Sequence, residues 1–139
     1  VEIGSCLSGG LDSSAIVCLA REILGDRPYH VFCGRFPGTP ADEWEYAERI
    51  IDHTGAVPHV SEPTAPDLLS RIGDFAWFNE LPVSSTSQFA QWTVFESAKD
   101  AGVTVLLDGQ GSDELLGGYE QYFRNYLNAR WHWRTTRKP

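Results

Sequence analysis

The fold is decided by the opening stretch of the chain, VEIGSCLSGGLDSS, residues Val1–Ser14. Residues 1–7 are mostly apolar and predict a strand, Ser8-Gly9-Gly10 interrupts it, and apolar residues then recur at helical spacing from Ser13 to Leu24. A strand, a glycine turn and a helix therefore follow one another directly. In an open parallel sheet, ligands bind at such a turn, beyond the carboxyl end of the strand.

The rest of the chain continues this alternation. We expect further strands at residues 30–36, 56–60 and 103–107, and helices at 42–54, 67–78, from Ser84 or Ser85 to about 101, and from 119 to about 133. The run at 103–107 is continuously apolar, which is typical of a strand buried on both faces. The pattern predicts an α/β fold, a doubly wound parallel sheet with helices on both faces, as one domain over residues 1–139.

The glycine turn has the features of a phosphate site. Gly9 and Gly10 allow the backbone to approach a ligand closely, and the helix start offers unpaired N–H groups and a positive dipole end. Ser8, Ser13 and Ser14 add hydroxyl groups. The alternative is a serine-capped helix after a tight turn. We favour a phosphate or pyrophosphate ligand because glycines and serines are concentrated at a strand-to-helix junction.

A carboxylate beside this turn indicates a metal ion. Asp12 would repel a phosphate unless a divalent cation lay between them, and Mg²⁺ is usually held by one or two carboxylates together with substrate phosphates. A second turn, DGQGSDELLGG at residues 108–118, follows the strand at 103–107 and contains Asp113 and Glu114. We expect Asp113 to be the second magnesium ligand. The alternative is that these acids stabilise a helix start. For Glu114, a role at the ligand and a role at the helix start are equally supported.

These motifs resemble those of a known family. SGGLDSS at residues 8–14 is similar to the pyrophosphate loop of the N-type ATP pyrophosphatases. LLDGQGSDELLGGY at residues 106–119 resembles the second signature of one branch, the glutamine-hydrolysing asparagine synthetases, and residues 42–47 and 82–87 are similar to that branch as well. The resemblance covers nearly the whole chain. It implies a PP-loop ATP-pyrophosphatase fold of the adenine-nucleotide alpha-hydrolase type.

The resemblance also implies an enzyme, a carbon–nitrogen ligase. The aspartate side chain would attack ATP to form β-aspartyl-AMP and pyrophosphate, and ammonia from glutamine would displace AMP to give asparagine. By matched positions, adenosine would lie against Leu7, Cys33, Asp108 and Gly109, pyrophosphate against Ser8, Gly9, Gly10, Asp12 and Ser13, and Mg²⁺ between Asp12 and Asp113 as the catalytic residues. Cys33 would contact adenine through its backbone, or would be a core residue only.

The chain departs from the family pattern in ways that leave alternatives open. Gln110 stands where the best-known members carry a glutamate, so the same fold could act as an amidotransferase or cyclase on another carboxylate in a peptide, antibiotic or glycan pathway. The family's N-terminal glutaminase domain and its C-terminal helical region have no counterpart in this sequence. The chain also lacks methionine. We therefore expect a fragment of a longer protein, which on its own could be an inactive nucleotide-binding module.

Composition and charge exclude several classes of partner. The net charge is −8, and residues 1–123 carry six basic against nineteen acidic side chains, a net −13, which disfavours nucleic-acid binding. No apolar run approaches the roughly 18 residues of a membrane span. The cysteines at 6, 18 and 33 lack zinc spacing and suggest reduced thiols in the cytoplasm. Expected partners are the small-molecule substrates, the glutaminase domain of the full-length protein and a second copy in a homodimer.

Overall fold

A computed structural model describes residues 1–83 and 85–136 of this chain. They form two compact units, one from Val1 to Asp108 and one from Gly109 onward. The first unit contains β1 (Ile3–Cys6), α1 (Leu11–Leu24), β2 (His30–Gly34), α2 (Trp44–Thr54), β3 (Val57–Ser61), α3 (Ala65–Asn79), α4 (Ser87–Asp100) and β4 (Val105–Leu107). The second contains α5 (Ser112–Leu116) and α6 (Glu120–Thr136).

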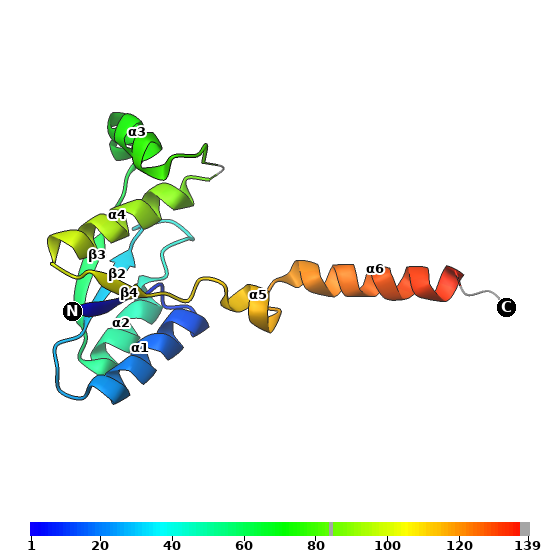
Figure 1. Ribbon diagram of the computed structural model, residues 1–139, viewed down its shortest axis with the longest axis horizontal. Helices are drawn as coiled ribbons and strands as arrows, with labels where there is room; N and C mark the ends of the chain where they lie inside the picture. The colour runs from blue at the N-terminus through cyan, green and yellow to red at the C-terminus, as the bar shows by residue number, and fades with distance from the viewer. Residues whose placement is uncertain (84, 137–139) are drawn as a thin grey trace. The chain divides into compact units, whose positions relative to one another are not determined.

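The first unit is built on a parallel sheet whose strand order is β3-β2-β1-β4. In the ribbon view, α1 and α2 lie together on one side of the sheet and α3 and α4 on the other (Figure 1). Because every strand pair is parallel, all the carboxyl ends reach the same edge of the sheet. The predicted fold class, a parallel sheet with helices on both faces, is confirmed.

Alternating side chains along β2 divide the core into two layers. Val31 and Cys33 belong to the layer beneath α1 and α2, together with Val17 of α1. Phe32 points to the opposite face and packs with Val94 and other residues beneath α4. This is the two-residue period of a strand buried on both faces, so the central strand β2 ties the two layers together.

The expectation that the last strand is buried on both faces is wrong. Val105 and Leu107 each remain 40% exposed. In the described part of the chain β4 pairs only with β1 and forms one edge of the sheet. An apolar run predicts a strand, but its burial depends on the strand's place in the sheet order.

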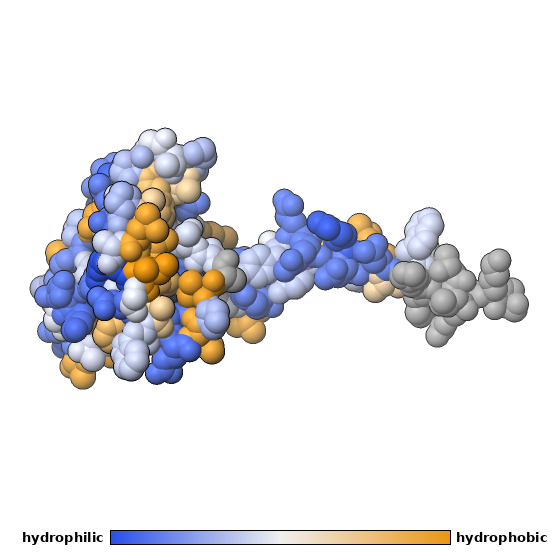
Figure 2. Space-filling model, turned by 90° about the horizontal axis from the view of Figure 1, so that it is seen from above, coloured by the Kyte–Doolittle hydropathy of each residue, from blue (hydrophilic) through white to orange (hydrophobic). Residues whose placement is uncertain are grey.

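Figure 2 shows a band of apolar surface on the unit formed by residues 1–108.

Helix ends shift by a few residues from the expected positions. Helix α1 begins at Leu11 instead of Ser13, so Asp12 lies in its first turn. Helix α4 begins at Ser87 with Thr86 as its N-cap residue, and the Ser85 hydroxyl accepts a hydrogen bond from the Ser87 N–H at 3.2 Å. The alternative start at Ser84 lies outside the described residues. Helix α2 ends at Thr54 as expected, and Gly55 follows it with φ +63°.

The second unit consists of the short helix α5 and the long helix α6 after it. Gly111 and Gly117 flank α5 with φ values of +92° and +75°, a backbone conformation that favours glycine. Neither α6 nor any other helix among the described residues is long and apolar enough to cross a membrane.

Candidate functional site

The loop between β1 and α1 lies at the carboxyl edge of the sheet. The Leu7 N–H donates to the Phe32 carbonyl at 2.9 Å, which continues the β1–β2 pairing to the start of the loop. Gly10 is the N-cap residue of α1, and no side chain caps the first turn. Amide groups of that turn have no partner within the helix. The loop therefore ends in an open helix N-terminus, which is suited to an anion.

Two serines fix the shape of this loop from within. Ser13 is buried, and its hydroxyl donates to the Gly10 carbonyl at 3.2 Å and accepts from the Ser8 N–H at 3.3 Å. The Ser8 hydroxyl lies 3.1 Å from the Ser13 hydroxyl and accepts from the Gly10 N–H at 3.2 Å. The structure thus brings Ser8, Gly9, Gly10 and Ser13 together. The Ser13 hydroxyl is engaged in holding the loop.

Ser14 is a different case. Its Oγ atom is buried, and it makes no hydrogen bond among the described residues. Buried hydroxyls are normally satisfied, and an unsatisfied one often marks a place that a water or ligand completes. Its position in the first turn of α1 agrees with a polar ligand at this helix start.

Gly9 brings the loop against the start of α2. Its φ is +92°, and a Cβ at this position would lie 2.7 Å from the Ala47 nitrogen, 2.8 Å from Tyr46 Cβ and 3.1 Å from the Glu43 carbonyl oxygen. No side chain fits there without displacing backbone atoms. The close contact that this glycine permits in the structure is with α2, and the predicted approach of the loop to a ligand stays a prediction.

The second turn begins beside the first loop. Strand β4 is the parallel neighbour of β1, and Asp108, the residue after β4, accepts a hydrogen bond from the Cys6 thiol at the end of β1. Burial, followed by the Asp108 carboxylate, raises the pKa of Cys6 to about 12. The start of the predicted second turn thus reaches the same edge as Ser8.

Two predicted adenosine contacts have buried side chains. Leu7 and Cys33 are each 2% exposed and belong to the core beneath α1 and α2. Burial raises the pKa of Cys33 to about 11. Cys6 packs on the opposite face of the sheet, so these two cysteines are not placed to form a disulfide. Only backbone atoms of Leu7 and Cys33 are left for a ligand at the edge.

The remaining predicted residues lie in the second unit. Asp113 is in the first turn of α5, and its carbonyl accepts the N–H groups of Gly117 and Gly118 at 2.9 and 3.0 Å. The Glu114 carboxylate accepts the Tyr119 hydroxyl at 3.1 Å, which raises the pKa of Tyr119. The Glu114 carboxylate is thus engaged within its own unit, and a role toward the ligand stays a prediction. The pairing of Asp12 with Asp113 stays a prediction.

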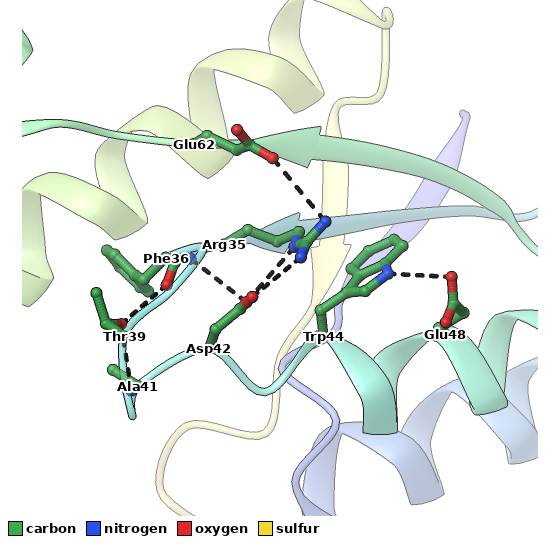
Figure 3. A network of polar contacts seen from close by, with 8 residues as sticks. All are labelled: Arg35, Phe36, Thr39, Ala41, Asp42, Trp44, Glu48 and Glu62. Atoms are coloured by element: carbon green, nitrogen blue, oxygen red, sulfur yellow. Dashed lines mark hydrogen bonds and ion pairs between the residues drawn. The ribbon is translucent and has the colours of Figure 1, made fainter.

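The sequence analysis did not predict an ion-pair network that lies at the end of β2 (Figure 3). Arg35 follows β2 directly, and its Nη2 lies 3.0 Å from Asp42 Oδ2. Its guanidinium also lies 4.0 Å from the Glu62 carboxylate and 4.8 Å from the centroid of the Trp44 ring. The Arg35 hydrogen bond holds the pKa of Asp42 below its usual range. The sequence did contain a signal for this network: Arg35 is a single arginine at the end of a strand, and Asp42 is an acidic residue shortly before the next helix.

The described residues contain no group of three or more histidine, cysteine, aspartate or glutamate side chains that would hold a metal ion unaided. Mg²⁺ usually takes few protein carboxylates and relies on phosphates and water, and a magnesium ion at Asp12 stays a prediction. Asp12, partly exposed at the open start of α1, is suited to such a role.

Comparison with known proteins places the chain among asparagine synthases. The asparagine synthase family model matches residues 1–138. Asparagine synthetase B of Escherichia coli is 31% identical over 153 aligned residues, covering 99% of this chain and 27% of that protein. The asparagine synthetase of Asparagus officinalis is 29% identical, covering 99% and 25%, and Amidase chry2 of Gibberella zeae is 28% identical, covering 92% and 21%. The chain thus spans about a quarter of the length of these relatives.

Among solved structures, a protein of Methanocaldococcus jannaschii described as a predicted subunit of tRNA methyltransferase is similar to this chain, with a TM-score of 0.47 and 21% identity. The similarity covers 79% of this chain and 53% of that one. It carries no argument about function.

Proposed function

This chain belongs to the asparagine synthase family, and we propose on that premise that residues 1–139 are part of the ATP-pyrophosphatase domain of an asparagine-forming, glutamine-hydrolysing ligase. The observation that carries the proposal is the loop of residues 7–10. It ends in the uncapped start of α1 at the carboxyl edge of a parallel sheet, where a nucleotide phosphate would be expected.

The proposed reaction has two steps. A side-chain carboxylate oxygen of aspartate attacks the α-phosphorus of ATP, the bond to the bridging oxygen breaks, and pyrophosphate leaves. Ammonia then attacks the β-carbonyl carbon of β-aspartyl-AMP, AMP leaves, and asparagine forms with loss of a proton. The protein contributes mostly positioning and stabilisation of negative charge. Amide groups at the start of α1 are suited to the charge that grows on the leaving pyrophosphate.

The proposed residue roles are those that the resemblance to the family implies. Pyrophosphate would be held by Ser8, Gly9, Gly10, Asp12 and Ser13, and adenosine would lie against Leu7, Cys33, Asp108 and Gly109. We expect Leu7 and Cys33 to act through backbone atoms because their side chains are buried. When bound, Mg²⁺ would neutralise phosphate charge, held by Asp12 of α1 and Asp113 of α5.

The whole protein would need further partners. Its substrates would be ATP, aspartate and ammonia, and a glutaminase domain elsewhere in the polypeptide would supply the ammonia from glutamine. Cys6, Cys18 and Cys33 are free thiols, which supports a reducing, cytoplasmic location. A homodimer completes the proposed assembly.

The test is calorimetry of ATP binding to the full-length protein with and without Mg²⁺. Asp12→Ala and Asp113→Ala should each weaken Mg²⁺-dependent ATP binding by about tenfold or more. Glu22→Ala is the matched control, because it removes a carboxylate from the last turn of the same helix α1, and it should leave the affinity unchanged. ATP binding that ignores Mg²⁺, or that survives both substitutions, would overturn the proposed site.

A further inference from the structure

Arg35 is tied to both the sheet and the loop that leads into α2. Its backbone N–H donates to the Ser61 carbonyl at 2.8 Å, so its position is fixed by the end of β3. Its side chain reaches across the connecting loop to Asp42, with Nη2 3.0 Å from Oδ2 and Nε 3.5 Å from Oδ1. Two roughly parallel contacts of this kind fix the orientation of a carboxylate as well as its distance.

Asp42 receives a second anchor from the same loop. Its Oδ1 accepts the Phe36 N–H at 3.4 Å, and its side chain is only 15% exposed. Asp42 thus closes the loop of residues 36–42 onto the end of β2 (Figure 3). The next residue, Glu43, is the N-cap residue of α2, so the closed loop determines where that helix begins.

The start of α2 lies against the glycine loop. The Glu43 carbonyl and the Ala47 nitrogen are within about 3 Å of where a Cβ of Gly9 would be. Because the Gly9 Cα is one bond from that position, the two backbone segments are packed against each other and cannot shift independently. A displacement of the first turn of α2 would therefore move Gly9, and with Gly9 the amide groups that follow it.

A second cluster of the same composition lies elsewhere in the first unit. Arg71 of α3 makes a paired contact with Glu96 of α4, with Nη1 2.9 Å from Oε2, and its guanidinium lies 4.3 Å from the centroid of the Trp92 ring. Arg35 and Arg71 therefore each contact a carboxylate and an indole ring, and both arginine side chains are partly exposed. The Arg71 cluster joins α3 to α4, on the opposite side of the sheet from α1 and α2 (Figure 1), which makes it a matched control.

We propose that Arg35 is a positioning residue for the phosphate-binding loop: it holds Asp42, and through Asp42 the start of α2 that supports Gly9. The role as a phosphate loop rests on the proposed function, whereas the mechanical coupling of Arg35 to the loop does not. A partly exposed ion pair contributes little to global stability. The consequence of losing it should therefore appear in the loop and in pyrophosphate binding.

The experiment compares Arg35→Met with Arg71→Met in the full-length protein, using two readouts. Amide hydrogen exchange of a peptide spanning residues 8–14 should become about tenfold faster in Arg35→Met and stay unchanged in Arg71→Met. Calorimetry with inorganic pyrophosphate should show about tenfold weaker binding in Arg35→Met only, while adenosine, which lacks phosphate, should bind both variants alike. Arg35→Lys should recover part of each effect, because lysine keeps the charge but not the two parallel contacts.

Each outcome separates the two proposals. Equal exchange of residues 8–14 in wild type and Arg35→Met, or an equal rise in Arg71→Met, would overturn the positioning role. If wild type binds no pyrophosphate while the exchange of the loop still depends on Arg35, the proposed function fails and the positioning role is supported. Asp42→Asn provides a second test, since combining it with Arg35→Met should add little to either single effect.

Discussion

At the scale of single residues, Gly9 has little freedom to change. Its φ of +92° disfavours any side chain, and a Cβ would in addition meet backbone atoms of α2. Gly9→Ala should lower the free energy of unfolding in two ways. Backbone strain should cost about 1–3 kcal/mol, and overpacking against α2 should cost a similar amount. We expect a lower midpoint of urea unfolding, together with loss of pyrophosphate binding because the loop must move.

Gly25 provides the control for this prediction. It also has a positive φ, +63°, but nothing lies within 4 Å of where its Cβ would be. Gly25→Ala should therefore lower the free energy of unfolding only through backbone strain, by about 1–3 kcal/mol. Equal losses in the two variants would show that contact with α2 does not restrict Gly9.

The same scale shows what the sequence could and could not predict about the site. The glycine turn, its serines and Asp12 were recognisable because they are adjacent in the chain and follow a strand. Arg35 was not recognised because its partners are set by the fold: Asp42 by the course of a loop, and Glu62 by the pairing of β2 with β3. Local motifs identify the residues that would contact a ligand, whereas the residues that support them depend on tertiary structure.

At the scale of elements, a histidine pair joins β2 to β3 on the face covered by α4. His30 Nδ1 and His59 Nε2 are 2.8 Å apart, and the His59 ring stacks on Phe32 with centroids 4.7 Å apart. Such a hydrogen bond requires at least one unprotonated nitrogen to accept it. Burial, and then the neighbouring His30, lower the pKa of His59.

This pair predicts a pH dependence of stability. Because the pKa of His59 is lower in the folded state, the folded chain binds fewer protons than the unfolded chain at pH values near that pKa. The stability is therefore highest above the pKa of an unfolded histidine, about 6.5, and decreases as the pH falls below that value. Urea unfolding at about pH 7.5 and 5.5 should show this loss in wild type and a smaller loss in His59→Phe, which keeps an aromatic ring on Phe32. His53→Phe, at an exposed position on α2, should leave the wild-type loss unchanged. An unaltered pH dependence in His59→Phe would contradict the prediction.

The elements themselves were predictable because each repeats a strong local pattern. Apolar periodicity predicted the strands β1 to β4 and the helices α1 to α4 and α6, whereas the five-residue helix α5 lies in a turn too short to show it. The burial of β4 was not predictable, since the same apolar run would suit a central strand. Its edge position follows from the strand order, which depends on which strands pair and not on the local sequence.

At the scale of the molecule, the two edges of the sheet differ in a way that should control association. Both edge strands expose valine to the same extent, Val57 of β3 and Val105 of β4. Strand β3 contains Pro58, which cannot donate a backbone hydrogen bond and so protects that edge. Strand β4 is Val-Leu-Leu without proline or charge. An unprotected apolar edge favours strand pairing between molecules.

We therefore expect the 139-residue chain to self-associate through β4 at concentrations of tens of micromolar, roughly the range where exposed edges begin to pair. Sedimentation velocity should show association in wild type and much less in Val105→Lys, because a charged side chain on an edge strand opposes pairing. Val57→Lys places the same charge on the edge that Pro58 already protects, and it should associate like wild type. Circular dichroism of both variants establishes that the fold is retained. If Val57→Lys reduces association as much as Val105→Lys does, the effect comes from net charge and not from the β4 edge, and a homodimer through β4 is excluded.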